Sequence, residues 1–274
     1  MKLNQILALI LLTITTGSCT QRAYYQSPTH GNTNGYKAMP LKSENSATAL
    51  YADLSLMTGW ANENLKDKLF GLSGSIHRAH AFGNFQAFYG SNAMFGRYQA
   101  NAFYPQFEDV FWYVNGNLND SLINSLSGPK NFASVGLYGG INLVRSLENG
   151  SEWRVIGAEF AWQNEWGSYY DFRNKLPVTA ANVIDYNQNF ATISFTSDII
   201  FKLNKEETIG YKAALGFPTR RLTYYNTSSQ PGKVLPHNFS QTLHVGFKKT
   251  TLHAQVNHGY YMLNMQMGLN YRLR

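Results

Sequence analysis

The sequence predicts an all-β fold: an antiparallel transmembrane β-barrel of about twelve strands, with ten as the alternative. Three observations predict it. Apolar and polar residues alternate with a period of two through most of the chain, as in strands with one apolar and one polar face. Charged residues make up only 14% of the chain, against about 25% in ordinary soluble domains. Beyond the N-terminus, no apolar run approaches the roughly 20 residues that a membrane-spanning helix needs.

The N-terminal residues 1–18 are predicted to be a signal peptide, with Lys2 as its positive charge and residues 6–14 as a short apolar core. The small residues 16–18 precede Cys19, the only cysteine of the chain. This pattern resembles a bacterial lipoprotein signal, although Thr16 stands where leucine is commonest. The resemblance implies acyl chains such as palmitate on Cys19, which anchor the protein in the outer membrane. The alternative is an ordinary cleaved signal with a cysteine nearby by chance.

Residues 19–44 are rich in Ser, Thr, Asn, Gly and Pro and show little periodicity, which predicts a lipidated flexible tether ahead of a barrel at residues 45–274. Residues 20–23 lack the acidic run that resembles a surface-export signal of Bacteroidota lipoproteins. We therefore expect the lipid in the periplasmic leaflet.

The first five strands are predicted at residues 47–58, 68–78, 83–90, 93–100 and 107–115, with less regular alternation in the last two. Apolar residues recur at every second position of the first three strands. Their apolar faces are formed by Leu50, Ala52, Leu54 and Leu56, by Phe70, Leu72 and Ile76, and by Phe85, Ala87 and Tyr89.

The next six strands are predicted at residues 133–145, 153–170, 190–203, 208–217, 242–248 and 252–257. Their apolar faces are almost free of charge. They are formed by Val135, Leu137, Ile141 and Leu143, by Ile156, Ala158, Phe160 and Trp162, by Ile193, Phe195, Ile199 and Phe201, by Ile209, Tyr211, Ala213, Leu215 and Phe217, by Leu243, Val245 and Phe247, and by Leu252, Ala254 and Val256.

The last strand, residues 261–274, alternates most strictly and is long enough to cross a bilayer when tilted, which takes roughly 9–11 residues. A tyrosine stands near each end of its apolar face, where an aromatic girdle is expected. Its ending resembles the signal by which outer-membrane barrels are recognised, although the chain closes on Arg274 and not on an aromatic residue. The resemblance implies the barrel-assembly machinery as a partner during insertion, through Gln266, Gly268, Tyr271 and Leu273.

The predicted connections sort by length. Long polar ones at 59–67, 116–130, 171–188 and 226–238 fall on one side, and tight ones at 148–152, 204–207 and 248–251 on the other. Outer-membrane barrels have this asymmetry, with short periplasmic turns and long outer loops. The connection at 257–260 is tight but falls on the long side, as would a turn at 91–92. A soluble β-sandwich or lipocalin-like barrel shows the same alternation but has no reason to sort its loops.

The predicted polar faces carry both signs of charge into a narrow lumen. Opposite charges there would pair and hold the wall together, because an unpaired buried charge is costly. Alternatively they would line a selective pore for a small solute. These predicted lumen residues are Asp53, His77, Glu159, Glu165, Asp198, Lys202, Lys212, His244, His253 and Arg272.

The sequence offers no catalytic residues, metal ligands or cofactor motif. An outer-membrane lipid-modifying enzyme would need a nucleophile or metal, usually with a histidine, where lipid can reach it. No histidine of a clear strand falls on the predicted lipid-facing side, and His77 and His80, three apart, are more typical of polar surface than of a metal site. We therefore rank three functions: a structural or accessory subunit of an envelope machine for barrel assembly or protein secretion, then a narrow channel, then the enzyme.

The partners implied by this ranking are outer-membrane lipid and a protein of the same envelope complex. The net charge of +7 fits contact with anionic lipid or polysaccharide. Nucleic acid is a poor candidate, because the chain has no basic cluster.

Overall fold

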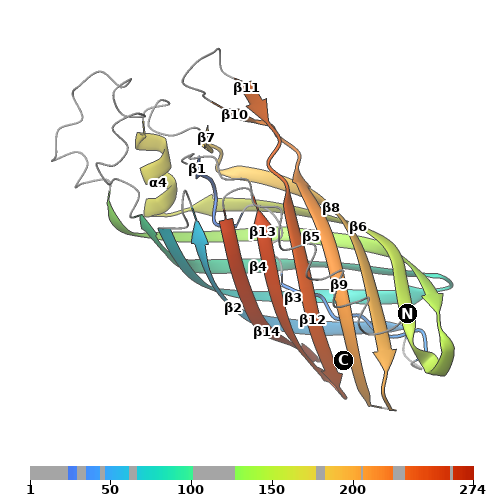
Figure 1. Ribbon diagram of the computed structural model, residues 1–274. Coiled ribbons are helices and arrows are strands. Elements are labelled where there is room, and N and C mark those ends of the chain that lie inside the picture. Colours follow the sequence, from blue (N-terminus) through green and yellow to red (C-terminus); the bar gives the residue numbers. More distant parts are fainter. Residues whose placement is uncertain are drawn as a thin grey trace, which may run out of the picture.

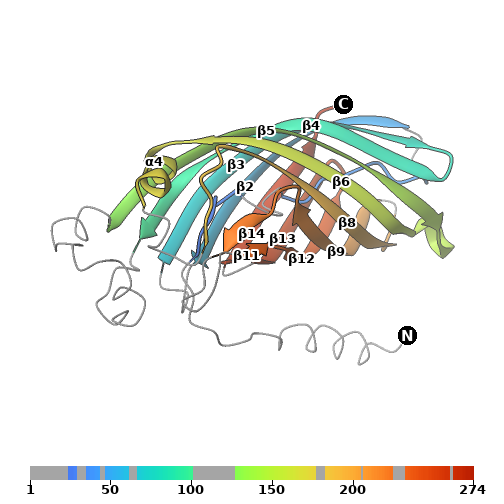
Figure 2. The same ribbon diagram turned by 90° about the horizontal axis from the view of Figure 1, so that it is seen from above.

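The computed structural model describes residues 24–29, 35–43, 47–61, 67–100, 127–176, 183–204, 206–224, 232–259 and 262–274. Ten antiparallel strands form a closed barrel, in which each strand pairs with its neighbour in the chain (Figures 1 and 2). The last strand pairs with the first and closes the ring. The strands are β2 (Thr48–Ala61), β3 (Asp67–Phe82), β4 (Phe85–Ala100), β5 (Gly128–Ser146), β6 (Glu152–Trp166), β8 (Asn189–Lys202), β9 (Glu207–Pro218), β12 (Asn238–Phe247), β13 (Thr250–Gly259) and β14 (Met262–Arg272).

The predicted fold class is confirmed, with ten strands and not twelve. The predicted break at 91–92 is wrong, because Ser91 and Asn92 pair with Ile76 and Ser75 within one continuous strand, β4. The predicted strand at 107–115 lies outside the described residues. The strand predicted at 153–170 ends earlier: β6 stops at Trp166, and Gly167, with φ of 114°, turns the chain into a short helix, α4 (Ser168–Lys175).

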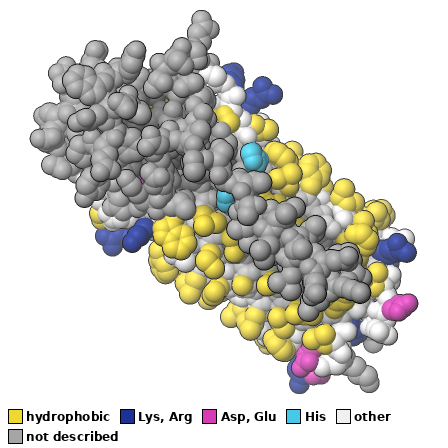
Figure 3. Space-filling view, in the orientation of Figure 1, with side chains coloured by type: hydrophobic (Ala, Val, Ile, Leu, Met, Phe, Trp, Pro, Cys, Tyr) yellow, Lys and Arg dark blue, Asp and Glu magenta, His cyan; other side chains and the backbone are white. Residues whose placement is uncertain are grey.

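Most of the large apolar side chains of the strands point away from the barrel. Leu137 is 60% exposed and Phe195 is 52% exposed, whereas the Ser, Thr and Asn residues between such positions are buried inside. In Figure 3, hydrophobic side chains cover the middle of the visible part of the barrel, and charged ones lie toward its ends. A closed ring pairs every strand edge, which a bilayer requires because it offers no water to unpaired backbone groups. The apolar exterior and polar interior are those of a membrane-spanning barrel.

No helix within the described ranges is long and apolar enough to span a membrane.

The connections differ in length between the two ends of the barrel. At one end, which we call the turn end, β3 and β4 are joined by Gly83-Asn84 and β12 and β13 by Lys248-Lys249. The connections at 147–151, with η3 (Glu148–Gly150), and at 203–206 are also at this end. Gly83, Asn149 and Lys248 have positive φ, as tight turns require.

The other end, which we call the loop end, carries the connections at 62–66, 101–127, 167–188 and 219–237. It also carries α4 and a small sheet of β1 (Tyr24–Tyr25), β7 (Val183–Ile184), β10 (Leu222–Tyr224) and β11 (Gly232–Val234) (Figure 1). The predicted sorting of connections by length is therefore present, and the tight β13–β14 connection at 260–261 is its exception. Outer-membrane barrels keep their short turns on the periplasmic side.

Two pieces of the predicted tether are buried in the barrel. Residues 35–43, which we call the inner segment, lie among side chains of the turn half of the wall, and residues 35–41 are all buried. Residues 24–29, which we call the mouth segment, lie at the loop end, where Tyr24 and Tyr25 pair in parallel with Val183 and Ile184. Both described pieces are therefore ordered parts of the barrel interior.

Gly268 sits at the closing seam, where β14 pairs with β2. A Cβ atom there would lie 2.6 Å from the Leu54 carbonyl oxygen and 2.4 Å from Ser55 Oγ, so the backbones would have to separate. We expect Gly268→Ala to destabilise the barrel by about 1–3 kcal/mol, the usual cost of overpacking. The measurement is urea unfolding in lipid vesicles.

Gly74→Ala is the matched control for the seam, because its Cβ would lie 3.8 Å from the nearest atom, the Asp53 carbonyl oxygen. Equal midpoints for the two variants would contradict a tight seam at Gly268.

Candidate functional site

The barrel wall binds the backbone of the inner segment through side chains of several strands. Asn270 of β14 donates from Nδ2 to the Tyr36 carbonyl oxygen (2.9 Å) and accepts from the Ala38 amide (3.4 Å). His77 of β3 donates from Nε2 to the Ala38 carbonyl oxygen (2.8 Å). Because these bonds replace water at the peptide groups, the segment can be buried without a large penalty.

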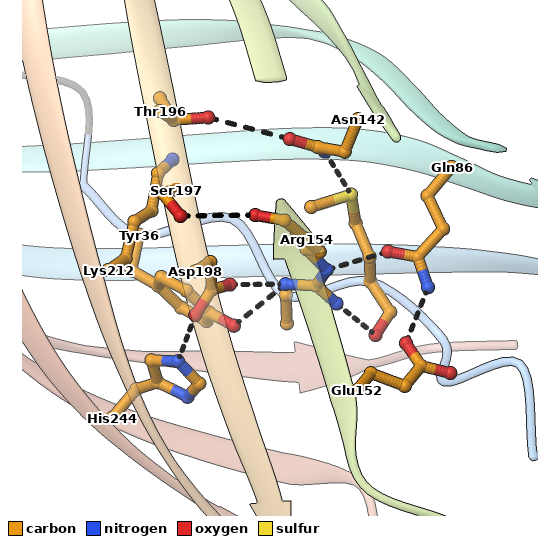
Figure 4. A network of polar contacts seen from close by, with 12 residues as sticks. Tyr36, Gln86, Asn142, Glu152, Arg154, Thr196, Ser197, Asp198, Lys212 and His244 are labelled. Carbon is orange, nitrogen blue, oxygen red and sulfur yellow. Dashed lines mark hydrogen bonds and ion pairs between the residues drawn. The ribbon is translucent and has the colours of Figure 1, made fainter. Parts of the chain in front are cut away.

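Arg154 of β6 is the centre of a polar network in the turn half (Figure 4). Its side chain is 1% exposed, and Nη1 lies 2.5 Å from Asp198 Oδ2. Nε donates to Gln86 Oε1 (2.6 Å), and Gln86 donates in turn to Glu152 Oε2 (3.0 Å). The other Asp198 oxygen accepts from His244 Nε2 (3.0 Å). The network therefore joins β4, β6, β8 and β12 across the lumen.

The inner segment is part of this network. Arg154 donates to the Tyr36 hydroxyl (3.3 Å) and to the Met39 carbonyl oxygen (3.4 Å). The Tyr36 ring stacks on His244, with centroids 4.1 Å apart. Gln86 Nε2 also donates to the Pro40 carbonyl oxygen (2.9 Å), and the Lys42 amide donates to Glu152. The buried guanidinium of Arg154 thus bonds both the barrel wall and the inner segment.

Lys37 carries a positive charge into the middle of the lumen. Its Nζ lies 3.6 Å from Asp53 Oδ1 and donates to Ser75 Oγ (2.8 Å). The ammonium also lies 4.8 Å from the centroid of the Tyr138 ring, within range of a cation–π contact. A buried lysine is tolerated only when its charge is met in this way.

A second cluster lies at the loop end, where α4 covers the mouth segment. Arg173 Nη2 lies 2.8 Å from Glu165 Oε2, and both side chains are buried. Burial alone lowers the pKa of Arg173, but the Glu165 carboxylate raises it, and the net pKa lies above its ordinary value. Tyr169 stacks on Tyr98 (4.1 Å) and donates to the Gln26 carbonyl oxygen (3.1 Å). Burial raises the pKa of the Tyr169 hydroxyl, so it stays protonated and can donate.

The structure places all of the predicted lumen residues on the inner side of the wall. The four acids each have a cation partner: Asp53 has Lys37, Glu159 has Lys212, Glu165 has Arg173 and Asp198 has Arg154. His77, His244 and His253 are buried, and Lys202 and Arg272 line the turn-end cavity described below. Two of the contacts join predicted residues to each other: Glu159 with Lys212, and Asp198 with His244.

The sequence analysis missed Arg154 because β6 carries a bulge. The pairing of β6 with β8 shifts register between Arg154 and Gly157. An unbroken period of two would put Arg154 on the same face as Ile156, outside, but the extra residue turns it inward. The signal available in the sequence is the apolar pair Val155-Ile156, which breaks the alternation.

Ser55, His253 and Asn270 form a chain of polar contacts inside the wall. Ser55 Oγ lies 3.4 Å from His253 Nε2, and His253 Nδ1 lies 3.4 Å from Asn270 Nδ2. Hydrolases use a nucleophile, a base and an orienting group in this order. Here, however, Ser55 donates to Asp53 (3.1 Å), and a Cβ on Gly35 of the inner segment would lie 2.9 Å from Ser55 Oγ. The inner segment therefore occupies the space that a substrate would need.

No group of three His, Cys, Asp or Glu side chains in the described part of the chain is arranged to hold a metal ion. His77 bonds the inner segment and His80 lies 3.2 Å from Thr48 Oγ1, so the two histidines have separate contacts.

The four residues of the predicted assembly signal take two positions in the barrel. Gln266 is buried on the inner side, whereas Tyr271 and Leu273 are exposed on the outer side. Gly268 of β14 also belongs to the inner side, where a Cβ would meet the side chains of Ser55 and His253. Cys19 lies outside the described residues.

A cavity of about 410 Å³ opens at the turn end, beneath the inner segment. Lys202, Lys249 and Arg272 line it together with Tyr36 and His244. Glu206 and Lys248, which pair with each other (3.3 Å), also line it, so the charged lining is mainly basic.

The sequence matches no protein-family model and no curated protein. Several solved structures share the general architecture. An outer-membrane channel from Pseudomonas putida F1 is 10% identical, with a TM-score of 0.41 over 88% of this chain and 98% of that chain. The β-domain of a Bordetella autotransporter is 10% identical, with a TM-score of 0.37 over 82% of this chain and 99% of that chain. A toluene transporter from Pseudomonas putida is 9% identical, with a TM-score of 0.34 over 92% of this chain and 95% of that chain. The architecture is that of an outer-membrane β-barrel. At these TM-scores nothing about the functions of those proteins carries over.

Proposed function

We propose that this protein is a lipid-anchored barrel of the bacterial outer membrane that serves as a structural or accessory subunit of an envelope machine, such as one for barrel assembly or protein secretion. The observation that supports this role is the occupied lumen. The inner segment is bound by side chains of β3, β4, β6 and β14. Its own Lys37 pairs with the buried Asp53, and its Tyr36 accepts from Arg154 and stacks on His244. A channel needs a continuous polar path, which this segment interrupts.

The proposed anchor is an acylated Cys19. It stands directly after the small residues that end the signal peptide, and it is the only cysteine. Each buried CH₂ of an acyl chain adds about 0.8 kcal/mol to membrane binding. The lipid therefore adds to an attachment that the apolar exterior of the barrel already provides.

We expect the purified full-length protein to show no steady conductance in planar lipid bilayers, because the inner segment fills the turn half of the lumen. Deleting residues 24–43 removes the inner segment together with the mouth segment, and we expect discrete conducting steps. The measurement is single-channel recording, with folding of both forms checked by their heat-dependent migration on gels.

A deletion of residues 219–223, in a loop-end connection, is the control and should stay silent. Steady conductance of the full-length protein would contradict the proposed role. The accessory role itself predicts a stoichiometric protein partner after extraction from native membranes in mild detergent, and a barrel recovered alone would count against it.

A narrow channel is the second candidate, favoured by the basic turn-end cavity. Its lining by Lys202, Lys249 and Arg272 would attract an anionic solute. Conduction would then require the inner segment to move, so currents that appear in the full-length protein only when an anionic solute is added would support this alternative.

A further inference from the structure

The mouth segment lies at the loop end of the barrel. Tyr24 pairs with Val183 and Tyr25 with Ile184, in a connection that follows the end of β6 and α4. The Tyr25 ring packs edge-on against Phe172 of α4, with centroids 5.3 Å apart, and its carbonyl oxygen accepts from the Asp185 amide (2.9 Å). All of these partners belong to the connection between β6 and β8, at the loop end of the barrel.

The inner segment runs from the middle of the lumen to the turn end. Gly35 lies against Ser55 and His253 inside the wall. At the other end of the segment, Lys42 bonds Asn84 in the β3–β4 turn (2.9 Å), and Ser43 bonds the Gly150 carbonyl oxygen (3.3 Å). β2 then begins at the same end, at Thr48. The chain thus has its earlier described residues at the loop end and its later ones at the turn end.

From this direction we infer that the chain before Tyr24 emerges on the external side of the membrane, and that the lipid on Cys19 is held in the external leaflet. The inference rests on the proposed lipid anchor and on the outward orientation of the long connections. The acyl chains on Cys19 would then insert in the surface-exposed lipid layer and not in the periplasmic leaflet that the sequence favours.

The length of chain between Cys19 and Tyr24 decides between the leaflets. Five residue steps span at most about 17 Å when fully extended. The hydrocarbon core alone is about 30 Å thick. β6 has 15 residues, and with a rise of about 3.3 Å per residue and a tilt of about 40° it spans more than that thickness. A chain that leaves the barrel beyond the end of β6 therefore cannot return its fifth preceding residue to the opposite leaflet.

The first experiment measures which side of the membrane the N-terminal residues face. A short epitope is inserted between Gln21 and Arg22, and a second variant carries it in the β8–β9 turn after Asn204. We expect antibody to label the first variant equally on intact and permeabilised cells, and the second only after permeabilisation. Labelling of the first variant only after permeabilisation would overturn the inference.

Lipid attachment is measured separately, by incorporation of radioactive palmitate into the wild type and into Cys19→Ser. Label in the wild type with a hidden N-terminal epitope would sink the external leaflet and leave the proposed anchor standing. An exposed epitope without label in the wild type would sink the anchor and with it the leaflet assignment.

The second experiment tests the path of the chain by a disulfide bond. Cys19 is the only natural cysteine, so Gly35→Cys with Ser55→Cys adds a single defined pair. A Cβ on Gly35 would lie 2.9 Å from Ser55 Oγ, which is one bond from the Ser55 Cβ. The two Cβ atoms therefore lie within about 4.5 Å of each other, as a disulfide requires.

We expect mild oxidation to cross-link this pair in membranes and change its migration on gels. Gly35→Cys with Asn257→Cys, which is buried nearer the loop end, should not cross-link. Cross-linking of the control, or of neither pair, would contradict the path.

Discussion

Arg154→Ala is expected to lower the free energy of unfolding by about 3–5 kcal/mol, because removing one partner of a buried ion pair leaves the other charge uncompensated. Asp198, 2% exposed, would keep only His244 as an ionic partner. Gln86, Tyr36 and Met39 would each lose a donor as well. The measurement is urea unfolding of the protein refolded into lipid vesicles, followed by tryptophan fluorescence.

Arg145→Ala is the matched control, because Arg145 is exposed near the turn end of β5. A surface substitution of this kind usually changes stability by no more than about 0.5 kcal/mol. Combining Arg154→Leu with Asp198→Leu should recover part of the loss, since the Asp198 charge is then removed together with its guanidinium partner. Equal losses for Arg154→Ala and Arg145→Ala would mean that the network does not hold the wall.

Phe195→Arg is expected to cost about 2–4 kcal/mol, the penalty for a cation near the bilayer midplane on the outside of a barrel. Phe195 lies in the middle of β8 and points outward. The guanidinium would have to stretch to an interface or draw water into the hydrocarbon core. Unfolding in vesicles measures the cost, and its dependence on lipid chain length locates the residue.

Phe247→Arg makes the same exchange at the last residue of β12, next to a turn-end connection. Near an interface the penalty falls to about 0–1 kcal/mol. If both variants lost the same stability, the outer belt would not be in contact with acyl chains.

The outside of the barrel could be predicted from the sequence because it follows a local rule. An outward residue such as Phe195 has polar neighbours, Ser194 and Thr196, on either side, and this period runs through most of the strands. The rule fails where apolar side chains such as Met57 and Phe88 pack inside the barrel, and where backbone irregularities intervene. The bulge at Arg154 reverses the phase, and the regular pleat through Ser91 and Asn92 shows that two small polar residues do not by themselves make a turn.

The contents of the lumen could not be predicted in this way. The inner segment has no periodicity, and its polar composition is equally typical of a linker. What holds it are partners far away in the chain: Asn270, which bonds Ala38, is 232 positions later. The acids of the wall were predicted as lumen residues, but the three cations that neutralise three of them were not. Lys37 lies in the predicted tether, Arg154 lies at the bulge that shifts the alternation of β6, and Arg173 lies in a helix that was not predicted.

The seam between β2 and β14 has a consequence for biogenesis. β14 is the last strand of the ring in chain order, and its pairing with β2 from Met262 to Arg272 closes the ring. The inner segment precedes β2 in the chain and is enclosed by the ring. It therefore has to lie among the wall side chains before the pairing of β14 with β2 closes the barrel. With an acylated N-terminus on the loop-end side, the inner segment could not slide out of the closed barrel. Its release would require β2 and β14 to separate.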